Sequence, residues 1–370
     1  MKILFITNNF PPIVDGVGDY TYNIAKQFVK HNHEVYVICK SNPQINTSVQ
    51  GMTILSIVNK WDCNCYKPII NLIKEKAIDV VSLQYVPHGF HPKGLPFPII
   101  KLTKEIKNSN AKLFTFFHEV SVEKEKRNIK RTLLSMLMQH ISKRIIENSD
   151  YVATSIEYYK NMIHKLVPDK KDIPLIPIAS NIPETKLSKE ELLALKKELA
   201  PNNETIISFF GIRNIQTSIN IISELRDKGY KLKILLIGKT HNLPKDLPND
   251  TIKTGVLNID EIDNFCKVSD IFILPQDNIY GCSFKSGSLV TGLRDALPVI
   301  TTKGKMTSAI LEDKKNILFT NFENLDEIRR TFLFLLNNQN TAFNIGKEAQ
   351  KVVKDFSWEE TYKKYNNIFK

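Results

Sequence analysis

The chain has 370 residues, and we expect two domains because domains settle at roughly 100 to 200 residues each. Hydrophobic residues make up 42% and charged residues 24%, proportions that exclude a disordered chain, a collagen and a coiled coil. No apolar run reaches about 18 residues, and Asn8 and Asn9 interrupt the apolar opening segment. The sequence therefore predicts neither a membrane span nor a signal peptide, and it favours a cytoplasmic location.

Five cysteines are an odd number without the spacing of a disulfide framework, so we expect reduced thiols. Cys63 and Cys65 are separated by one residue, and no second pair follows them. Structural zinc sites need four ligands, usually two such pairs with a wider spacing. We therefore predict no metal site.

The positive charge is concentrated in one part of the chain. The formal net charge is +12, and residues 101–171 alone contain 15 basic and 8 acidic residues. Such a field attracts an anionic membrane surface, a phosphorylated substrate or nucleic acid. The alternative is that abundant lysines cover solvated helix faces. No recognised nucleic-acid-binding module is present, so we predict no nucleic-acid partner.

Short β-branched runs alternate with helical patterns in the first half. We predict helical structure between these runs, for example over residues 20–31, where Tyr20, Ile24, Phe28 and His31 share one face. The alternation is typical of a parallel sheet covered by helices on both sides. The predicted strands are residues 2–7, 34–39, 79–85, 112–117 and 151–155.

A proline-rich segment separates this half from a second alternation. Four prolines lie between residues 167 and 183, which favours an interdomain connection after one last strand over residues 173–178. The pattern predicts domains over residues 1–180 and 181–355 and a terminal helix over 356–370, with Ser357 as its cap. Strands are predicted in the second domain at residues 205–211, 231–238, 271–275, 298–302 and 316–320.

Ligands of open parallel sheets bind beyond the carboxyl ends of the strands, so we expect the site residues there. Gly16 and Gly18 follow the first strand and precede a predicted helix. Glycine lets the backbone approach a ligand, and free amides at a helix start favour phosphate oxygens. The alternative is a glycine turn without a ligand, because a lone G-x-G is a weak signal.

His118 and Glu119 directly follow the predicted strand 112–117. A neutral imidazole there could bind a sugar hydroxyl or assist proton transfer, while Glu119 could orient a neighbour. The alternative is a histidine satisfied by a nearby carbonyl.

In the second domain, Gly211 and Arg213 follow a strand, and the planar guanidinium of Arg213 suits a diphosphate. Further along, Lys285, Ser286, Gly287 and Ser288 lead into a helix, so amides, hydroxyls and an ammonium group could converge on phosphate. These two segments indicate a nucleoside diphosphate held mainly by the second domain.

At these residues the chain resembles glycosyltransferase family 4, retaining sugar-nucleotide enzymes of the GT-B type. The similar segments include FPP followed by Gly16 and Gly18, FFHE at His118, IPIASNIP, FFGIRN at Arg213, LLIG at Gly238, ALPVITT and FSWEETYKKY. The resemblance implies an α/β fold of two Rossmann-like, doubly wound domains facing across a cleft, with the final helix crossing back to the first domain.

The resemblance also implies residue roles. His118 would lie by the transferred sugar, and Arg213 and Lys285 would neutralise the diphosphate leaving group. Asp19, Tyr85 and Glu119 would contact the acceptor. The donor site would comprise Gly16, Gly18, Gly211, Arg213, Gly238, Lys285, Ser286, Gly287, Ser288 and Thr291.

Two positions depart from the family pattern. The family usually has a Lys-Gly pair shortly after the arginine, where this chain has residues 214–217 with the sequence NIQT. It also usually has two glutamates eight residues apart, and Ser283 and Thr291 occupy those places. Lys285 with the following Gly-Ser-Leu resembles a variant subgroup.

The leading hypothesis is a hexosyltransferase that uses a UDP- or GDP-sugar without a cofactor and acts on a glycan or lipid-linked acceptor in bacterial surface polysaccharide or glycoconjugate synthesis. It would be cytoplasmic and could lie against the inner, anionic face of the membrane. The alternative is a catalytically weak GT-B-like protein that binds a nucleotide sugar or glycan as the partner of another transferase. A dinucleotide oxidoreductase is disfavoured, because no G-x-G-x-x-G follows a strand.

Overall fold

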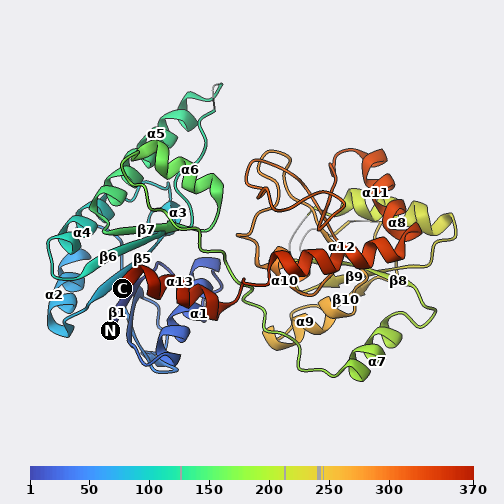
Figure 1. Cartoon of the computed structure of the whole chain (residues 1–370), viewed down its shortest axis with the longest axis horizontal. Helices are drawn as coiled ribbons and strands as arrows, with labels where there is room; N and C mark the ends of the chain where they lie inside the picture. The colour runs from blue at the N-terminus through green and yellow to red at the C-terminus, as the bar shows by residue number, and fades with distance from the viewer. Residues whose placement is uncertain (126, 212–213, 240–242, 245) are drawn as a thin grey trace. The chain divides into compact units, whose positions relative to one another are not determined.

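The computed structural model describes residues 1–125, 127–211, 214–239, 243–244 and 246–370. These residues form two compact units. The first comprises Met1–Ile178 and Trp358–Lys370, and the second comprises Ala179–Ser357 (Figure 1). All five cysteines are free, as expected. Within the described part of the chain, no helix has both the length and the apolar character that a membrane span requires.

The first unit contains a seven-stranded sheet with the order β3-β4-β2-β1-β5-β6-β7. All pairs are parallel except β3 with β4. The strands are β1 (Lys2–Ile6), β2 (Glu34–Lys40), β3 (Ser48–Val49), β4 (Met52–Val58), β5 (Val80–Tyr85), β6 (Lys112–Phe117) and β7 (Tyr151–Thr154). Successive residues of β1 and β5 are buried, because helices cover both faces of a parallel sheet.

The helices of this unit include one from the far end of the chain. They are α1 (Gly16–Lys30), α2 (Tyr66–Lys76), α3 (Pro87–Phe90), α4 (Phe97–Lys107), α5 (Ile129–Asn148), α6 (Glu157–Leu166) and α13 (Trp358–Phe369). Helix α13 packs on α1, where Tyr362 and Tyr365 contact the ring of Phe28 edge to face. The last helix is therefore part of the first unit's core.

The second unit contains a parallel six-stranded sheet with the order β10-β9-β8-β11-β12-β13. Its strands are β8 (Thr205–Phe210), β9 (Leu232–Ile237), β10 (Ile252–Lys253), β11 (Ile271–Leu274), β12 (Val299–Thr301) and β13 (Leu318–Phe319). Its helices are α7 (Lys189–Leu199), α8 (Gln216–Asp227), α9 (Ile259–Lys267), α10 (Gly287–Arg294), α11 (Leu325–Asn337) and α12 (Gln339–Val352). The predicted fold class, an α/β fold of two doubly wound domains, is confirmed.

Two expected elements differ from the structure. No strand forms over residues 173–178, where Leu175 makes only an isolated bridge to Thr154. Pro174 and Pro177 lack the backbone N–H groups that a further strand would donate. Helix α1 begins at Gly16 rather than after Gly18, because Asp15 caps it.

Candidate functional site

Each sheet has a switch point at which its strand order reverses. In the first unit β1 lies between β2 and β5, and in the second unit β8 lies between β9 and β11. Doubly wound sheets bind ligands beyond the carboxyl ends of the strands at such points. The relevant segments are therefore those that follow β1, β5 and β6 in the first unit and β8 and β11 in the second.

The segment after β1 runs directly into the amino end of α1. The Asp15 side chain caps the helix, and its Oδ2 accepts a hydrogen bond from the Gly18 N–H at 2.8 Å. Gly18 is buried, and a Cβ placed on it would lie 2.9 Å from the carbonyl oxygen of Asn9. Gly16 is exposed, and nothing lies within 4 Å of a Cβ placed there. Gly18 is thus required for backbone packing, whereas Gly16 leaves open room at the helix start.

His118 follows β6 and is almost fully buried, with 4% of its surface exposed. Its Nε2 lies 3.0 Å from Oε1 of Gln84, a fully buried residue of β5. Gln84 in turn donates from its amide nitrogen to Oγ of Ser82 at 2.8 Å. The buried amide oxygen of Gln84 is therefore one hydrogen-bonding partner of His118.

Aromatic rings surround the imidazole on its other sides. Tyr20 of α1 meets the His118 ring edge to face at 4.9 Å, and Phe116 lies 4.7 Å from it, both between ring centroids. The Tyr20 hydroxyl donates to the Tyr365 hydroxyl of α13 at 3.2 Å. Burial raises the pKa values of both tyrosines, so both hydroxyls stay protonated. Helices from both ends of the chain thus fix the position of His118.

The residues expected at the acceptor differ in their surroundings. Asp19 is half-buried in the first turn of α1, where burial, with a smaller contribution from Asp15, raises the pKa of its carboxyl. Glu119 is half-buried beside His118. Tyr85 is fully buried, with its ring against Phe90 and Phe117. Its side chain is therefore part of the core, so the acceptor contact expected for Tyr85 has no exposed surface to form on.

In the second unit, Gly211 and Gly238 end the neighbouring strands β8 and β9, and both have positive φ. No atom of the described residues lies within 4 Å of a Cβ placed on Gly211. Glycine is the residue that adopts this conformation without strain. Arg213, expected to bind the diphosphate, lies outside the described residues.

The segment expected to bind phosphate leads into α10. Ser286 caps this helix and accepts a hydrogen bond from the Leu289 N–H at 3.3 Å. Lys285, Gly287 and Ser288 are partly exposed around the cap. A helix start of this kind presents backbone N–H groups and a positive dipole end, which favour an anion.

Thr291, on the second turn of α10, is fully buried. Its hydroxyl is 2.7 Å from Oγ of Ser180 and donates to the Gly287 carbonyl at 2.8 Å. Ser283, at the other position where the family usually has glutamate, is also buried. Thr291 thus connects α10 with Ser180, near the start of the second unit.

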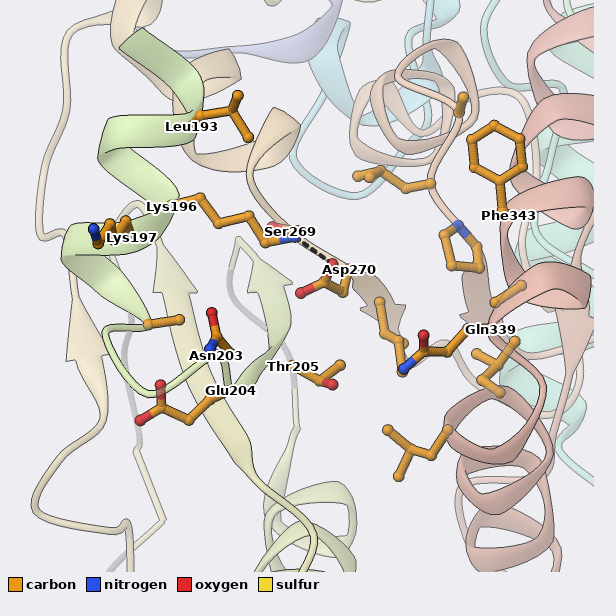
Figure 2. A pocket seen from close by; sticks show the side chains of 18 residues that line it. Leu193, Lys196, Lys197, Asn203, Glu204, Thr205, Ser269, Asp270, Gln339 and Phe343 are labelled. Carbon is orange, nitrogen blue, oxygen red and sulfur yellow. Dashed lines mark hydrogen bonds and ion pairs between the residues drawn. The ribbon is translucent and has the colours of Figure 1, made fainter. Parts of the chain in front are cut away.

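A pocket of about 680 Å³ lies at the other end of the second sheet, where its strands begin. Thr205, Ile271 and Pro298, at the amino ends of β8, β11 and β12, line it together with Leu193 and Phe343 (Figure 2). Doubly wound folds place their ligands at the carboxyl ends of the strands. This pocket is therefore separate from the candidate donor segments.

Sequence reasoning missed Gln84. A signal was present, because Gln84 is a large polar residue within the apolar run that forms β5. A buried amide needs a hydrogen-bonding partner, and His118 ends the next strand predicted along the chain.

The chain is similar in sequence to known glycosyltransferases. The model of Glycosyltransferase Family 4 matches residues 14–179, which form most of the first unit. The uncharacterized glycosyltransferase MJ1178 of Methanocaldococcus jannaschii is 21% identical over 373 residues, covering 97% of this chain and 95% of the relative.

Solved structures are similar over both units. Anabaena Alr3699/HepE, crystallised with UDP, has a TM-score of 0.72 at 13% identity, covering 100% of this chain and 99% of that chain. WaaG, a glycosyltransferase involved in lipopolysaccharide biosynthesis, has a TM-score of 0.65 at 12% identity and covers 99% of both chains. At this identity the likeness shows the fold.

Proposed function

We propose that this chain, a glycosyltransferase of the family 4 and GT-B type, transfers a hexose from a nucleoside diphosphate sugar to a hydroxyl of a lipid-linked glycan, with retained configuration. The observation that carries the proposal is the presence of glycines after the strands at both switch points, Gly16 and Gly18 after β1 and Gly211 and Gly238 after β8 and β9. Alr3699/HepE, which is similar in fold, binds UDP and UDP-glucose in its crystals.

The residues of the two units would divide the chemistry. The bond between the anomeric carbon and the diphosphate oxygen breaks, a bond to the acceptor oxygen forms, and the proton of the acceptor hydroxyl passes to the departing nucleoside diphosphate. Lys285 and Arg213, with the amides at the start of α10, would stabilise the charge on the departing diphosphate, usually the largest catalytic contribution. His118 would bind a hydroxyl of the transferred sugar. We propose that this chemistry needs no cofactor or metal.

A lipid-linked acceptor would place the protein at the inner face of the membrane, as a peripheral protein of the cytoplasm. The excess of basic residues between 101 and 171 supports this location, because anionic lipids attract such a segment. The role of WaaG in lipopolysaccharide biosynthesis supports an acceptor of the surface-glycoconjugate class.

One observation favours a second candidate function. Ser283 and Thr291 occupy the places of the usual glutamates, and both are buried. A transferase without these carboxylates could bind a nucleotide sugar or glycan as a catalytically weak partner of another transferase.

Thermal unfolding in the presence of candidate ligands tests the proposal, because a ligand that binds only the native state raises its stability. The ligands are UDP, GDP, CMP and NAD, with UDP- and GDP-sugars. We expect a rise with one nucleoside diphosphate and its sugar, followed by transfer to a lipid-linked acceptor. Binding without transfer or hydrolysis would favour the second candidate function. A rise with NAD alone would contradict both.

A further inference from the structure

Three large apolar side chains lie on the solvent side of the first half of α5. Ile129 is 84% exposed, Leu133 55% and Met136 52%. They are four and three residues apart, so they form one stripe along the helix. Surface helices normally carry polar residues on this side, because apolar groups in water cost free energy.

The stripe lies opposite the face that α5 buries. At 100° per residue, Met138 points about 180° from Ile129, and Met138, Ser142 and Ile145 are buried. The amino end of α5 projects beyond the rest of its unit (teal in Figure 1). The stripe therefore cannot be covered by the core of this unit, and its apolar area is available to a partner.

The charge around the stripe selects the kind of partner. The described residues among 124–131 include four exposed basic ones, Lys124, Arg127, Lys130 and Arg131, and one acidic residue, Glu125, which lies 3.6 Å from Arg131. His140 and Lys143 continue the exposed side of α5 beyond Met136. Two copies of this surface would bring like charges together, which disfavours a dimer. Apolar side chains flanked by basic groups instead fit a bilayer with anionic headgroups.

We propose that Ile129, Leu133 and Met136, with the exposed basic residues Lys124, Arg127, Lys130 and Arg131, form a docking surface for anionic lipid bilayers. The apolar stripe enters the boundary between headgroups and acyl chains, while the basic side chains contact the lipid phosphates. This inference deepens the proposed function, on which it rests for the lipid-linked acceptor, by identifying the part of the chain that meets the membrane.

Sedimentation with vesicles tests the surface without any donor or acceptor. We expect the full chain to bind vesicles of phosphatidylcholine and phosphatidylglycerol, and to bind pure phosphatidylcholine much more weakly. Replacing Ile129, Leu133 and Met136 together by serine should lower the partition coefficient at least about tenfold, since each change removes apolar area from the bilayer. Raising the salt to roughly 1 M should also weaken binding, because screening then acts within about 3 Å.

A matched control variant distinguishes vesicle binding through this surface from nonspecific binding through other exposed apolar groups. Val256, Ile310 and Leu325 of the second unit are 80%, 48% and 48% exposed, so their triple serine variant removes similar apolar groups from elsewhere. This control should bind vesicles like the unchanged chain. Equal loss in both triple variants, or unchanged binding of the α5 variant, would overturn the proposal.

Two further measurements keep the outcomes distinct. Light scattering in solution should show the same mass for the unchanged chain and the α5 variant; a dimer abolished by the substitutions would identify a second copy as the occupant instead. Transfer to a water-soluble acceptor should survive in the α5 variant. Vesicle binding without any transfer would refute the proposed function but leave the docking surface intact.

Discussion

Oε1 of Gln84 lies 3.0 Å from Nε2 of His118. With the amide nitrogen of Gln84 donating to Ser82, this oxygen is the acceptor of the pair, so Nε2 of His118 carries a proton. Since Gln84 is fully buried on β5, the sheet itself holds the imidazole in this state.

Replacing Gln84 by leucine should remove this control. The ring N–H of His118 would lose its acceptor inside the core, which costs about 1–3 kcal/mol in the free energy of unfolding. Urea unfolding measures the loss. Nitrogen-15 NMR of the imidazole should show the Nε2-protonated form in the unchanged chain and a mixture of tautomers in the variant. Gln84→Glu keeps an acceptor and should keep the proton on Nε2. Identical imidazole spectra in the leucine variant would contradict this role of Gln84.

The two glycines at the start of α1 should respond differently to alanine. In Gly18→Ala the new methyl group would meet the Asn9 carbonyl oxygen at 2.9 Å, and such overpacking costs about 1–3 kcal/mol. Gly16→Ala places its methyl group in open space and should stabilise the fold by about 0.4–1 kcal/mol through the unfolded chain. Chemical denaturation of both variants checks the pair, and equal effects would show that the Asn9 contact does not matter.

A buried ionic cluster in the second unit should make stability depend on pH. Asp263 pairs with Arg294 and accepts from the Thr185 N–H at 2.7 Å, while Asp295 pairs with Arg294 and Lys267. Burial and the neighbouring Asp295 raise the pKa of Asp263 from 3.8 to about 7. The folded state therefore retains a proton between these values that the unfolded state loses, so this group's contribution to stability falls as pH rises from 3.8 to about 7.

Asp263→Asn should abolish that contribution, because the amide does not titrate. The free energy of unfolding of the variant should fall less between pH 4 and 7 than that of the unchanged chain, with a slope difference of at most one proton. Urea titrations at several pH values measure both slopes. Parallel curves would mean that Asp263 is already ionised in the folded state at low pH.

Lys285→Ala should remove most of the thermal stabilisation that a nucleoside diphosphate gives. Lys285 directly precedes Ser286, the cap of α10, and its positive charge would add to that of the helix amides on a bound diphosphate. Lys197→Ala is the matched control, since Lys197 lines the pocket at the other end of the same sheet. The control should retain the full ligand-induced rise in melting temperature. If instead Lys197→Ala loses the ligand-induced rise, the nucleotide binds in that pocket and not at α10.

Most sheet strands were predictable because they are short runs of apolar, β-branched residues. Such continuous runs are typical of strands that are buried on both faces of a parallel sheet. β6 begins and ends where the sequence predicted. The strand expected over residues 173–178 failed for a local reason, since its prolines cannot donate to a ladder. β4 was missed although MTILSIV is rich in β-branched residues, because residues 41–51 between β2 and β4 contain the short strand β3 and no helix, which breaks the β-then-α alternation.

Site residues were harder to predict than strands. The positions of His118 and Gly18 follow from the strand ends, but their partners depend on register. Gln84 meets His118 only because β5 and β6 pair with Tyr85 opposite Phe117. The partner of Thr291 is Ser180, which lies far away in the sequence, and no periodic pattern contains that contact.

The return of α13 to α1 has a consequence for how the protein can be divided. The second unit is an insertion within the first, joined to it by two covalent links, at residues 178–179 and 357–358. A fragment that stops at residue 178 would leave Phe28 and Phe114 without the rings of Tyr365 and Phe369 that cover them. An independent first unit therefore requires a fused chain in which a short linker joins residue 178 to residue 358, whereas the second unit can be excised as one continuous piece.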